Sequence, residues 1–418
     1  MFDVYLHEMR AGTLTPRGRG VRFVYSVGAL ESGALPALSV SLPKRVQPFP
    51  DSQAGPFFRN LLPEQAYRRL VAAAVGTPAD SSLALLGAIG GECPGAVSIW
   101  PTNAARPTRP EYRPLSREEL GALFSPTDRG PFLSAIARGR LSLAGVQEKI
   151  ALLRDDAGRW HLPIGGAVTS HILKQATPAF PHLLGNELFC MTLARAAGLD
   201  VADAGLAAPD VRVFCAERFD RLRPPGPGGP PRLRLHQEDF CQVLRIEPDR
   251  KYEADGGPGL RQCADVIRRY SGLPAVDLQR LLRWVGFNYL VGNEDGHAKN
   301  LALLYRDDGL RLTPHYDLVS TEVYAGLERR LAMKIGRASD IRNVQRDDWQ
   351  RCAALVGLPW ERVRTSLLEL KEVITKESEG SIATCVQRYG EAPVYRNIEG
   401  VLKRRGEQLE RELSRAAR

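Results

Sequence analysis

The sequence predicts an α+β protein that consists of a small N-terminal module, a mixed lobe and a mainly helical lobe. Three patterns support this: alternating apolar segments near the N-terminus, a hairpin–strand–helix–strand order in the middle, and helical periodicity toward the C-terminus. Prolines from Pro101 to Pro114 mark the end of the module, because each fixes φ and removes a backbone donor. We expect the module at residues 1–105, the mixed lobe at 106–220 and the helical lobe at 221–418.

The N-terminal module is expected to combine short extended segments with a helical stretch. The extended segments are Phe2–Leu6, Val21–Tyr25, Leu38–Leu42 and Ala96–Trp100. Helical spacing of apolar residues predicts a helix over Ala66–Val75. The module carries no obvious catalytic set, so we assign it to support or partner binding.

The mixed lobe begins with a predicted hairpin, in which Ile150–Arg154 and Trp160–Pro163 flank a turn at 155–158. A strand over His171–Gln175 follows. Apolar residues then recur every three or four positions over Leu184–Ala197, and Gly198 supplies a C-cap, which predicts an amphipathic helix. Val211–Glu217 returns to strand.

The helical lobe opens with a segment, 221–234, so rich in proline and glycine that no regular element is expected in it. One apolar face over Leu278–Tyr289 predicts a buried helix that leads into Gly292. The end, Arg396–Arg418, is expected to form an exposed helix with a narrow apolar stripe made by Ile398, Val401, Leu402 and Leu409.

Composition excludes several classes of protein. With 44% apolar and 25% charged residues among 418, the chain is neither disordered nor fibrous. Apolar runs are too short to span a bilayer and the N-terminus lacks a signal pattern, so we expect a cytoplasmic protein without membrane contact. Seven cysteines without a CxxC pair argue against a zinc ribbon or disulfides, and we expect them reduced and buried. The net charge of +9 permits attraction to phosphate polymers but names no partner.

The most informative segment is the polar loop Gly292–Asn300, which contains Asp295, His297 and Asn300. An apolar strand, a turn at 306–309 and a second strand follow, and this hairpin should return His315-Tyr316-Asp317 to the loop. The sequence therefore predicts that two carboxylates and an amide converge.

This set suits phosphoryl transfer, in which one aspartate accepts the proton of a hydroxyl while an asparagine and a second aspartate hold magnesium. Kinases place the catalytic aspartate five residues before the metal-binding asparagine, as Asp295 and Asn300 stand here. The alternative is a polar turn beside an aspartate, Asp317, that caps the next helix.

The mixed lobe offers groups for the phosphates of a nucleotide. Lys174 lies on a predicted strand where kinases keep a phosphate-binding ammonium, with Glu187 as a possible ion-pair partner, although a strand lysine often points to solvent. No Walker loop and no GxGxxG between a strand and a helix occurs. The segment Ser142–Lys149, with small residues at 144 and 145, would let backbone N–H groups approach phosphate oxygens, although such a turn is often only a turn.

These motifs together resemble HipA-type serine/threonine-protein kinases, the toxins of bacterial toxin–antitoxin pairs. The resemblance covers nearly the whole chain, and the motifs that carry it are Ser39–Pro43, Phe57–Pro63, Ala88–Gly90, Gly95–Val97, Ser142–Lys149, His171–Lys174, Glu217–Arg221, His236–Asp239, Lys251–Glu253, Asp255–Gly259 and Gly292–Asn300. The resemblance implies a HipA-like, two-lobed, protein-kinase-like fold with a mixed N-lobe and a mainly helical C-lobe. The segment 221–234 has no counterpart that we can match to the family.

The resemblance also implies roles for individual residues. Asp295 would be the catalytic base, Asn300 and Asp317 would bind Mg²⁺, and Ser142 would be the site of autophosphorylation, which expels the phosphate loop. The residues implied in ATP binding are Ala144, Gly145, Val146, Gln147, Glu148, Lys149, Lys174, Glu217, Arg218, Phe219, His297, Ala298, Lys299, Asn300, Tyr316 and Asp317. Glu217 and Phe219 would meet adenine largely through backbone groups.

The implied target is an aminoacyl-tRNA synthetase, glutamyl-tRNA synthetase in the best-known case, whose modification halts translation. The implied partner is a HipB-like helix-turn-helix antitoxin, and the complex would bind operator DNA. Two alternatives stay open at this point. The chain could be a phosphotransferase acting on a small molecule, or a DNA-binding corepressor with weak or absent kinase activity.

Overall fold

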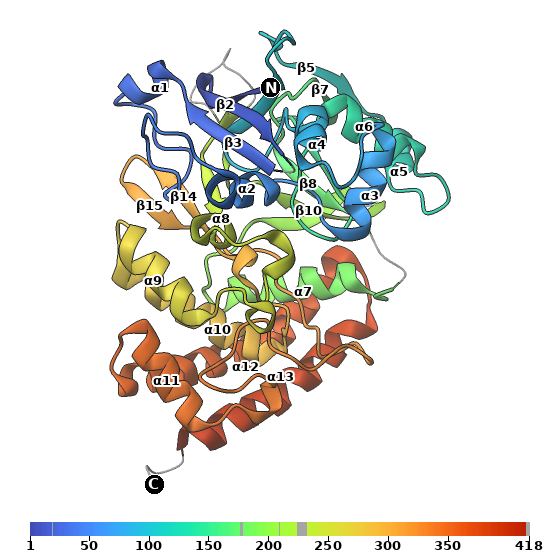
Figure 1. Ribbon diagram of the computed structural model, residues 1–418. Helices are drawn as coiled ribbons and strands as arrows, with labels where there is room; N and C mark the ends of the chain where they lie inside the picture. The colour runs from blue at the N-terminus through green and yellow to red at the C-terminus, as the bar shows by residue number, and fades with distance from the viewer. Residues whose placement is uncertain (19, 176–178, 209, 224–231, 415–418) are drawn as a thin grey trace. The chain divides into compact units, whose positions relative to one another are not determined.

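The computed structural model describes residues 1–418 except 19, 176–178, 209, 224–231 and 415–418 (Figure 1). The described chain forms two compact units. Unit 1 contains Met1–Gln175, Asp210–Asp249 and Leu304–Asp307, and unit 2 contains Ala176–Pro209, Arg250–Leu303 and Asp308–Arg418. Each unit is therefore assembled from stretches that lie far apart in the sequence.

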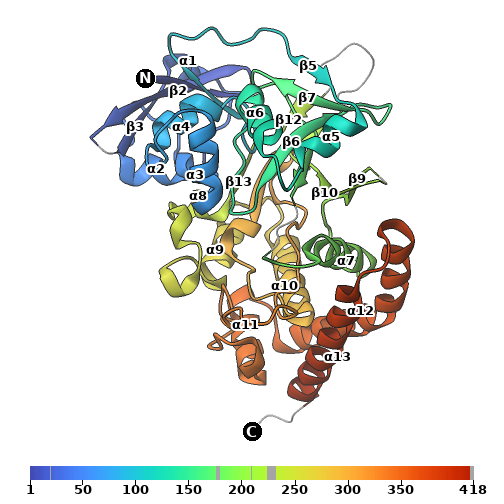
Figure 2. The ribbon, with the colours of Figure 1, turned by 90° about the vertical axis from the view of Figure 1, so that its right-hand side faces the viewer.

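The first part of unit 1 is a four-stranded antiparallel sheet with helices packed beside it (Figure 2). The strand order is β3-β2-β1-β4, with β1 at Phe2–Leu6, β2 at Met9–Arg17, β3 at Gly20–Tyr25 and β4 at Val97–Pro101. The helices are α1 (Val27–Glu31), α2 (Asp51–Arg59), α3 (Gln65–Ala74) and α4 (Ser82–Ile89). Because β1 pairs with both β2 and β4, the first strand of the module lies next to its last strand.

The second part of unit 1 is an antiparallel sheet whose strands follow the order β5-β7-β6-β8-β10. These strands are Glu111–Pro114, Trp160–Ile164, Lys149–Arg154, His171–Lys174 and Val211–Glu217. Two helices precede the hairpin, α5 (Arg117–Leu123) and α6 (Gly130–Gly139). Three short strands and a helix follow β10, namely β11 (Arg221–Leu222), β12 (Leu233–Arg234), β13 (Gln237–Asp239) and α8 (Phe240–Leu244).

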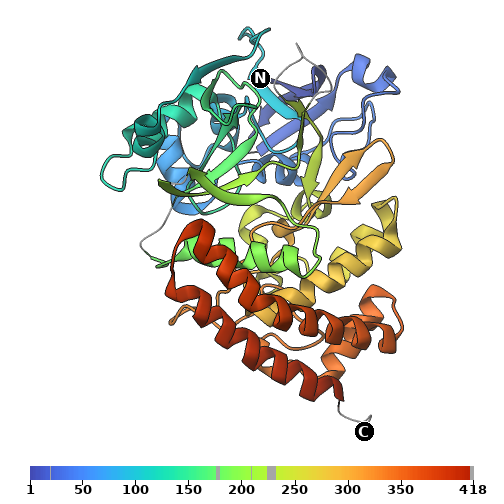
Figure 3. The ribbon, with the colours of Figure 1, turned by 180° about the vertical axis from the view of Figure 1, so that it is seen from behind.

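Unit 2 is mainly helical. Its helices are α7 (Leu183–Ala196), α9 (Leu260–Tyr270), α10 (Pro274–Val291), α11 (Arg346–Val356), α12 (Trp360–Tyr389) and α13 (Pro393–Ser414). The helix α10 is buried along most of its length and packs against α9, α12 and α13, and the last two lie side by side, drawn in red in Figure 3. The short elements are β9 (Ala204–Ala208), β15 (Gly309–Leu312) and the 3₁₀ turns Glu253–Asp255, Ala298–Asn300 and Ile341–Asn343; β14 (Ala302–Arg306) and the turn Pro248–Arg250 cross the boundary between the units.

Most of the predicted elements are confirmed. The strands β1, β3, β4, β6, β7, β8 and β10 and the helices α3 and α7 lie within one or two residues of their predicted bounds, and α10 contains its predicted apolar face and leads into Gly292. All seven cysteines lie in the described part of the chain, and each is buried and free of a disulfide. Among the described helices, none combines the length and apolar character that crossing a bilayer requires.

Three local predictions were wrong. Leu38–Leu42 is not a strand, because only an isolated bridge joins Ser39 and Leu42. The ends of 221–234 do form strands, since β11 and β12 contain no proline and pair with each other; residues 224–231 lie outside the described residues. The last helix is less exposed than predicted, because Arg405 and Glu412 are buried together with its predicted apolar stripe. The predicted domain boundaries remain predictions.

Candidate active site

The loop that carries Asp295 leaves α10 at a fixed point. Gly292 caps the helix in the left-handed conformation (φ 69°), and its N–H donates to the Tyr289 carbonyl. A Cβ at this position would lie 2.7 Å from the Glu322 carboxylate and 2.8 Å from Val401. Both the backbone angle and the close packing therefore require glycine here.

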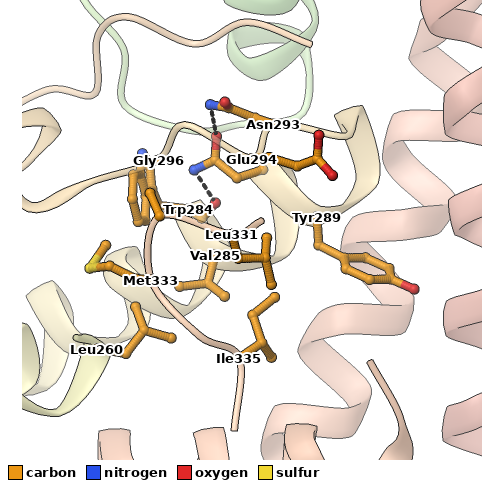
Figure 4. A pocket seen from close by; sticks show the side chains of 12 residues that line it. Leu260, Trp284, Val285, Tyr289, Asn293, Glu294, Gly296, Leu331, Met333 and Ile335 are labelled. Atoms are coloured by element: carbon orange, nitrogen blue, oxygen red, sulfur yellow. Dashed lines mark hydrogen bonds between the residues drawn. The ribbon is translucent and has the colours of Figure 1, made fainter. Parts of the chain in front are cut away.

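A chain of amide groups then holds the backbone of Asp295. Asn288 Nδ2 donates to the Trp284 carbonyl (2.9 Å), and Asn293 Nδ2 donates to Asn288 Oδ1 (2.7 Å), as Figure 4 shows. Asn293 Oδ1 in turn accepts from the Asp295 N–H (3.0 Å). Asn288 and Asn293 are buried, whereas Asp295 is exposed. The buried amides therefore fix the backbone of the loop and leave the Asp295 carboxylate open to solvent.

Asn300 and Asp317 meet directly, as predicted. Asn300 Oδ1 accepts from the His297 N–H (2.9 Å), and Asn300 Nδ2 donates to Asp317 Oδ2 (3.2 Å). Tyr316 Oη also donates to the Lys299 carbonyl (2.7 Å), which holds the returning segment against the loop. Asp317 has φ 60°, a conformation that aspartate tolerates better than most residues. No described helix begins at Asp317, so the helix-cap alternative is wrong.

Tyr252 is a site residue for which sequence analysis gave no role. Its hydroxyl donates to Asp295 Oδ1 (2.9 Å), and its ring stands edge-on to that of His297, with 5.6 Å between centroids. The neighbouring backbone is clamped, because Glu253 N–H donates to the Ala332 carbonyl and Ala332 N–H donates to the Glu294 carbonyl. The only signal in the sequence was the family motif Lys251–Glu253, since a loop tyrosine has no pattern of its own.

A small cavity of about 30 Å³ lies under the loop (Figure 4). Its lining is mostly apolar and includes Leu260, Trp284, Val285, Leu331, Met333 and Ile335. Gly296 rests on the Trp284 ring, which a Cβ would approach to 3.2 Å. A space of this volume holds about one or two water molecules.

Burial shifts the pKa values of two titratable groups next to the loop. Burial raises the pKa of Glu294, against the opposing attraction of Arg329. Burial also lowers the pKa of His315 to about 3, helped by the charge of Arg280, so this histidine is neutral at physiological pH. His315 therefore serves packing beside Trp284, with ring centroids 6.3 Å apart.

In unit 1, two lysines flank the predicted phosphate loop. Lys149 and Lys174 stand opposite each other on β6 and β8, and the Lys174 ammonium lies 5.0 Å from the centroid of the Phe214 ring on β10. Lys174 is 7% exposed, so the solvent-facing alternative is wrong. Gly145 has φ 107°, and the Lys149 ammonium lies 2.8 Å from where its Cβ would be. A small residue at 145 therefore lets a cation stand over the loop.

The rest of the loop is tied to the end of β8. Gln175 N–H donates to the Glu148 carbonyl (3.0 Å), and Gln147 Nε2 donates to the Gln175 carbonyl (3.0 Å). Arg129 bonds the side chains of both Glu148 and Gln175. Val146 is exposed at the tip, and Ala144 is partly exposed.

The predicted adenine-contacting segment lies at the end of β10. Glu217 pairs with His171 across the sheet. Arg218 donates its N–H to the Ser170 carbonyl (2.9 Å), while its guanidinium is buried against Asp220 and Glu92. The side chain of Arg218 therefore stabilises the fold. Phe219, next to it, is partly exposed.

The guanidinium of Arg218 belongs to a buried ion cluster. Glu92 is paired with Arg218 (3.3 Å), Arg221 (2.8 Å) and Arg234. Burial alone would raise the pKa of Glu92, but these three guanidiniums outweigh it and hold the pKa at about 2. The cluster therefore ties β10 and its continuation to the loop after α4.

Three comparisons with known proteins bear on this arrangement. A family model for the HipA N-terminal domain matches residues 2–100, and one for the HipA-like C-terminal domain matches residues 141–377. The chain is 40% identical over 357 residues to the Sinorhizobium fredii protein Y4mE, which covers 83% of this chain and 84% of that protein. It is 32% identical over 318 residues to the serine/threonine-protein kinase toxin HipA of Shewanella oneidensis, covering 73% and 72% of the two chains.

A solved structure gives the same fold. A chain in the Shewanella oneidensis MR-1 complex of HipA, HipB and operator DNA matches with a TM-score of 0.79 and 26% identity, over 99% of this chain and 96% of that one. This match confirms the predicted HipA-like, protein-kinase-like fold class.

Proposed function

We propose that this chain, which belongs to the HipA family, is an ATP- and Mg²⁺-dependent serine/threonine-protein kinase that acts in the cytoplasm as a toxin. The observation that carries the proposal is the hydrogen bond between Asn300, five residues beyond Asp295 on the same loop, and Asp317, which follows the hairpin. That arrangement provides a base and a pair of oxygen donors, which is what phosphoryl transfer asks of a protein.

In this proposal Asp295 accepts the proton of the attacking hydroxyl. Its carboxylate is exposed, while Tyr252 holds one of its oxygens and thereby sets the direction of the other. The γ-phosphoryl group passes from ATP to the substrate oxygen, and ADP leaves with the electron pair of the broken bond. Lys149, Lys174 and the backbone of 144–148 would bind the phosphates, and the segment 217–219 would meet adenine.

The donor set fits magnesium. Mg²⁺ prefers oxygen ligands and commonly takes one or two carboxylates from the protein together with phosphate oxygens of the substrate. Asp317 supplies a carboxylate and Asn300 an amide oxygen, while the described residues contain no cluster of three or more histidine, cysteine, aspartate or glutamate side chains that would form a complete protein site. When bound, the ion would neutralise charge on the phosphates.

We further propose an aminoacyl-tRNA synthetase as the target, glutamyl-tRNA synthetase being the first to test, with inhibition of translation as the result. The proposed partner is a HipB-like helix-turn-helix antitoxin, and the complex would bind operator DNA. The related Shewanella structure contains HipB and operator DNA, and the net charge of +9 suits contact with phosphates.

We also propose that the kinase modifies itself on Ser142. This serine begins the phosphate loop, and a phosphate there would add about −1.5 to −2 charges beside those of ATP. The added repulsion would drive the loop out of its binding position and stop the reaction.

The proposal is tested by incubating the purified chain with ATP, Mg²⁺ and a bacterial lysate and locating new phosphosites by mass spectrometry. New phosphoserine or phosphothreonine on a synthetase and on Ser142, absent with an Asp295→Asn variant, is the expected result. Phosphate on small molecules alone would identify a different phosphotransferase. Operator binding without ATP affinity would identify a corepressor, and either result would contradict the proposal.

A further inference from the structure

The accessory module, residues 1–105, holds the phosphate segment 142–149 of unit 1 by three sets of contacts. Ser142 Oγ donates to the Leu61 carbonyl (2.7 Å), and Ser142 N–H donates to the Glu92 carbonyl (2.9 Å). Glu64 N–H donates to the Gly145 carbonyl (3.0 Å). The Tyr67 hydroxyl donates to the Lys149 carbonyl. The beginning, middle and end of the segment are thus all bonded to the module.

These contacts come from rigid parts of the module. Leu61 lies in a buried turn after α2, and Glu64 is the residue from which α3 starts. Tyr67 is in the first turn of α3, buried, and burial raises the pKa of its hydroxyl, so the group stays a proton donor. Because α3 packs on α6, which runs into the segment, the module fixes both the contacts and the approach of the chain.

The same contacts hide the predicted modification site. Ser142 has no exposed surface, and its Oγ lies against the Leu61 carbonyl. A phosphoryl group brings about two negative charges and cannot be buried against a carbonyl oxygen without a large desolvation cost. Ser142 must therefore leave the module before its hydroxyl can reach a phosphoryl donor.

We propose that the accessory module acts as a clamp on the phosphate segment, which it holds in the ATP-binding conformation while it keeps Ser142 out of reach. The clamp gives the module a regulatory task, and anything that loosens it exposes Ser142. The link to phosphorylation depends on the proposed function, whereas the clamp itself does not. In that link Ser142 Oγ bonds to the γ-phosphorus, the bond to the bridging oxygen breaks to give ADP, and the hydroxyl proton goes to Asp295.

The test uses Tyr67→Phe in the full chain, which removes one clamp bond and keeps the ring. Tyr112→Phe is the matched control, because Tyr112 also donates its hydroxyl to a backbone carbonyl, that of Val168 (2.8 Å), elsewhere in unit 1. Hydrogen exchange of the peptide 141–149 is followed by mass spectrometry without nucleotide. We expect roughly three- to tenfold faster exchange in Tyr67→Phe and no change in the control. Equal exchange in all three proteins, or equal acceleration in both variants, would overturn the clamp.

A second variant keeps the test valid if Tyr67→Phe folds poorly. Ser142→Ala removes the bond to Leu61 from the other side and should speed exchange in residues 60–66 of the module, because coupling between two sites is reciprocal. Unchanged exchange there would count against the clamp.

Addition of ATP and Mg²⁺ separates the two proposals. Tyr67→Phe should acquire phosphate on Ser142 at least about threefold faster than the wild type. If exchange responds as expected but Ser142 is never phosphorylated in any variant, the clamp stands and the proposed self-modification fails.

Discussion

The loop around Asp295 and the phosphate segment are held in place by different means. The loop is fixed by side chains of unit 2, such as Asn288, Asn293 and Asn300, most of them a few residues apart. The phosphate segment is fixed largely through backbone carbonyls, and its partners Leu61 and Tyr67 lie 81 and 82 residues earlier. The function of the loop around Asp295 should therefore depend on the identity of its side chains. The function of the phosphate segment should depend on the integrity of the N-terminal module.

The largest effect is expected from Asp317→Asn. Asparagine keeps the size and tolerates the left-handed backbone, so the change removes the charge alone. Loss of a carboxylate ligand should lower Mg²⁺-dependent phosphoryl transfer by about 10³-fold. Steady-state assays across a range of Mg²⁺ concentrations measure it. Asp265→Asn on the exposed face of α9 is the control, and a variant at 317 that matches this control would refute the metal assignment.

The next effect concerns stability and the attachment of the module. Glu92→Gln would remove the buried carboxylate that pairs with Arg234 and would leave Arg218 and Arg221 with that of Asp220. We expect the free energy of unfolding to fall by about 3 to 5 kcal/mol, as measured by urea denaturation. Glu247→Gln removes a partly exposed partner of Arg59 and should cost under about 1 kcal/mol. Equal losses in the two variants would show that the buried cluster contributes no more to the free energy of unfolding than the partly exposed ion pair does.

Sequence analysis predicted the regions in which candidate catalytic residues stand next to a clearly patterned helix or strand. The loop after α10 was found because Asp295, Asn300 and Asp317 stand at fixed spacings around a hairpin, and α10 itself has a clear apolar face. The contact between Asn300 and Asp317 needed only local geometry. The role of each residue in catalysis was inferred from the family and remains a prediction.

What the sequence could not predict depends on distant contacts. Tyr252 reaches Asp295 across 43 residues, and Tyr67 reaches Lys149 across 82. No periodic pattern encodes such pairs, because each is created by the packing of separate elements. The apolar stripe of α13 was visible, but its burial depended on partner helices that one helix does not reveal.

The stability of the protein should depend on pH through Glu238, which contacts the module. Glu238 is buried against Ser39, Val40 and Tyr305 of unit 1, and burial raises its pKa to about 7, against the opposing hydrogen bonds. Between its ordinary value and 7 the folded state binds more protons than the unfolded state, so this group's contribution to stability falls as the pH rises.

Glu238→Gln isolates this contribution from that of the nearby His236. Burial lowers the pKa of His236 to about 4, so its contribution to stability rises with pH between about 4 and 6.5. Because His236 is present in both proteins, its contribution cancels in their difference. We expect the stability of the wild type relative to Glu238→Gln to fall by about 2 to 3 kcal/mol between pH 5 and 7.5. Urea denaturation at several pH values provides the measurement. A constant difference would mean that Glu238 does not titrate in this range.

The smallest effect is expected from Tyr252→Phe. The variant keeps the ring beside His297 and loses the hydrogen bond to Asp295, which should lower kcat about three- to tenfold with little change in KM for ATP. Tyr270→Phe, in the same unit, is the control. A loss confined to KM would show that Tyr252 acts on nucleotide binding rather than on the base.

The most direct test of the proposed kinase activity compares the wild type with Asp295→Asn in single-turnover phosphoryl transfer, alongside calorimetric binding of ATP and Mg²⁺. We expect transfer to fall by roughly 10²- to 10⁴-fold while the affinity for the nucleotide is kept, because the change removes only the proton acceptor. Transfer at the wild-type rate would contradict this expectation.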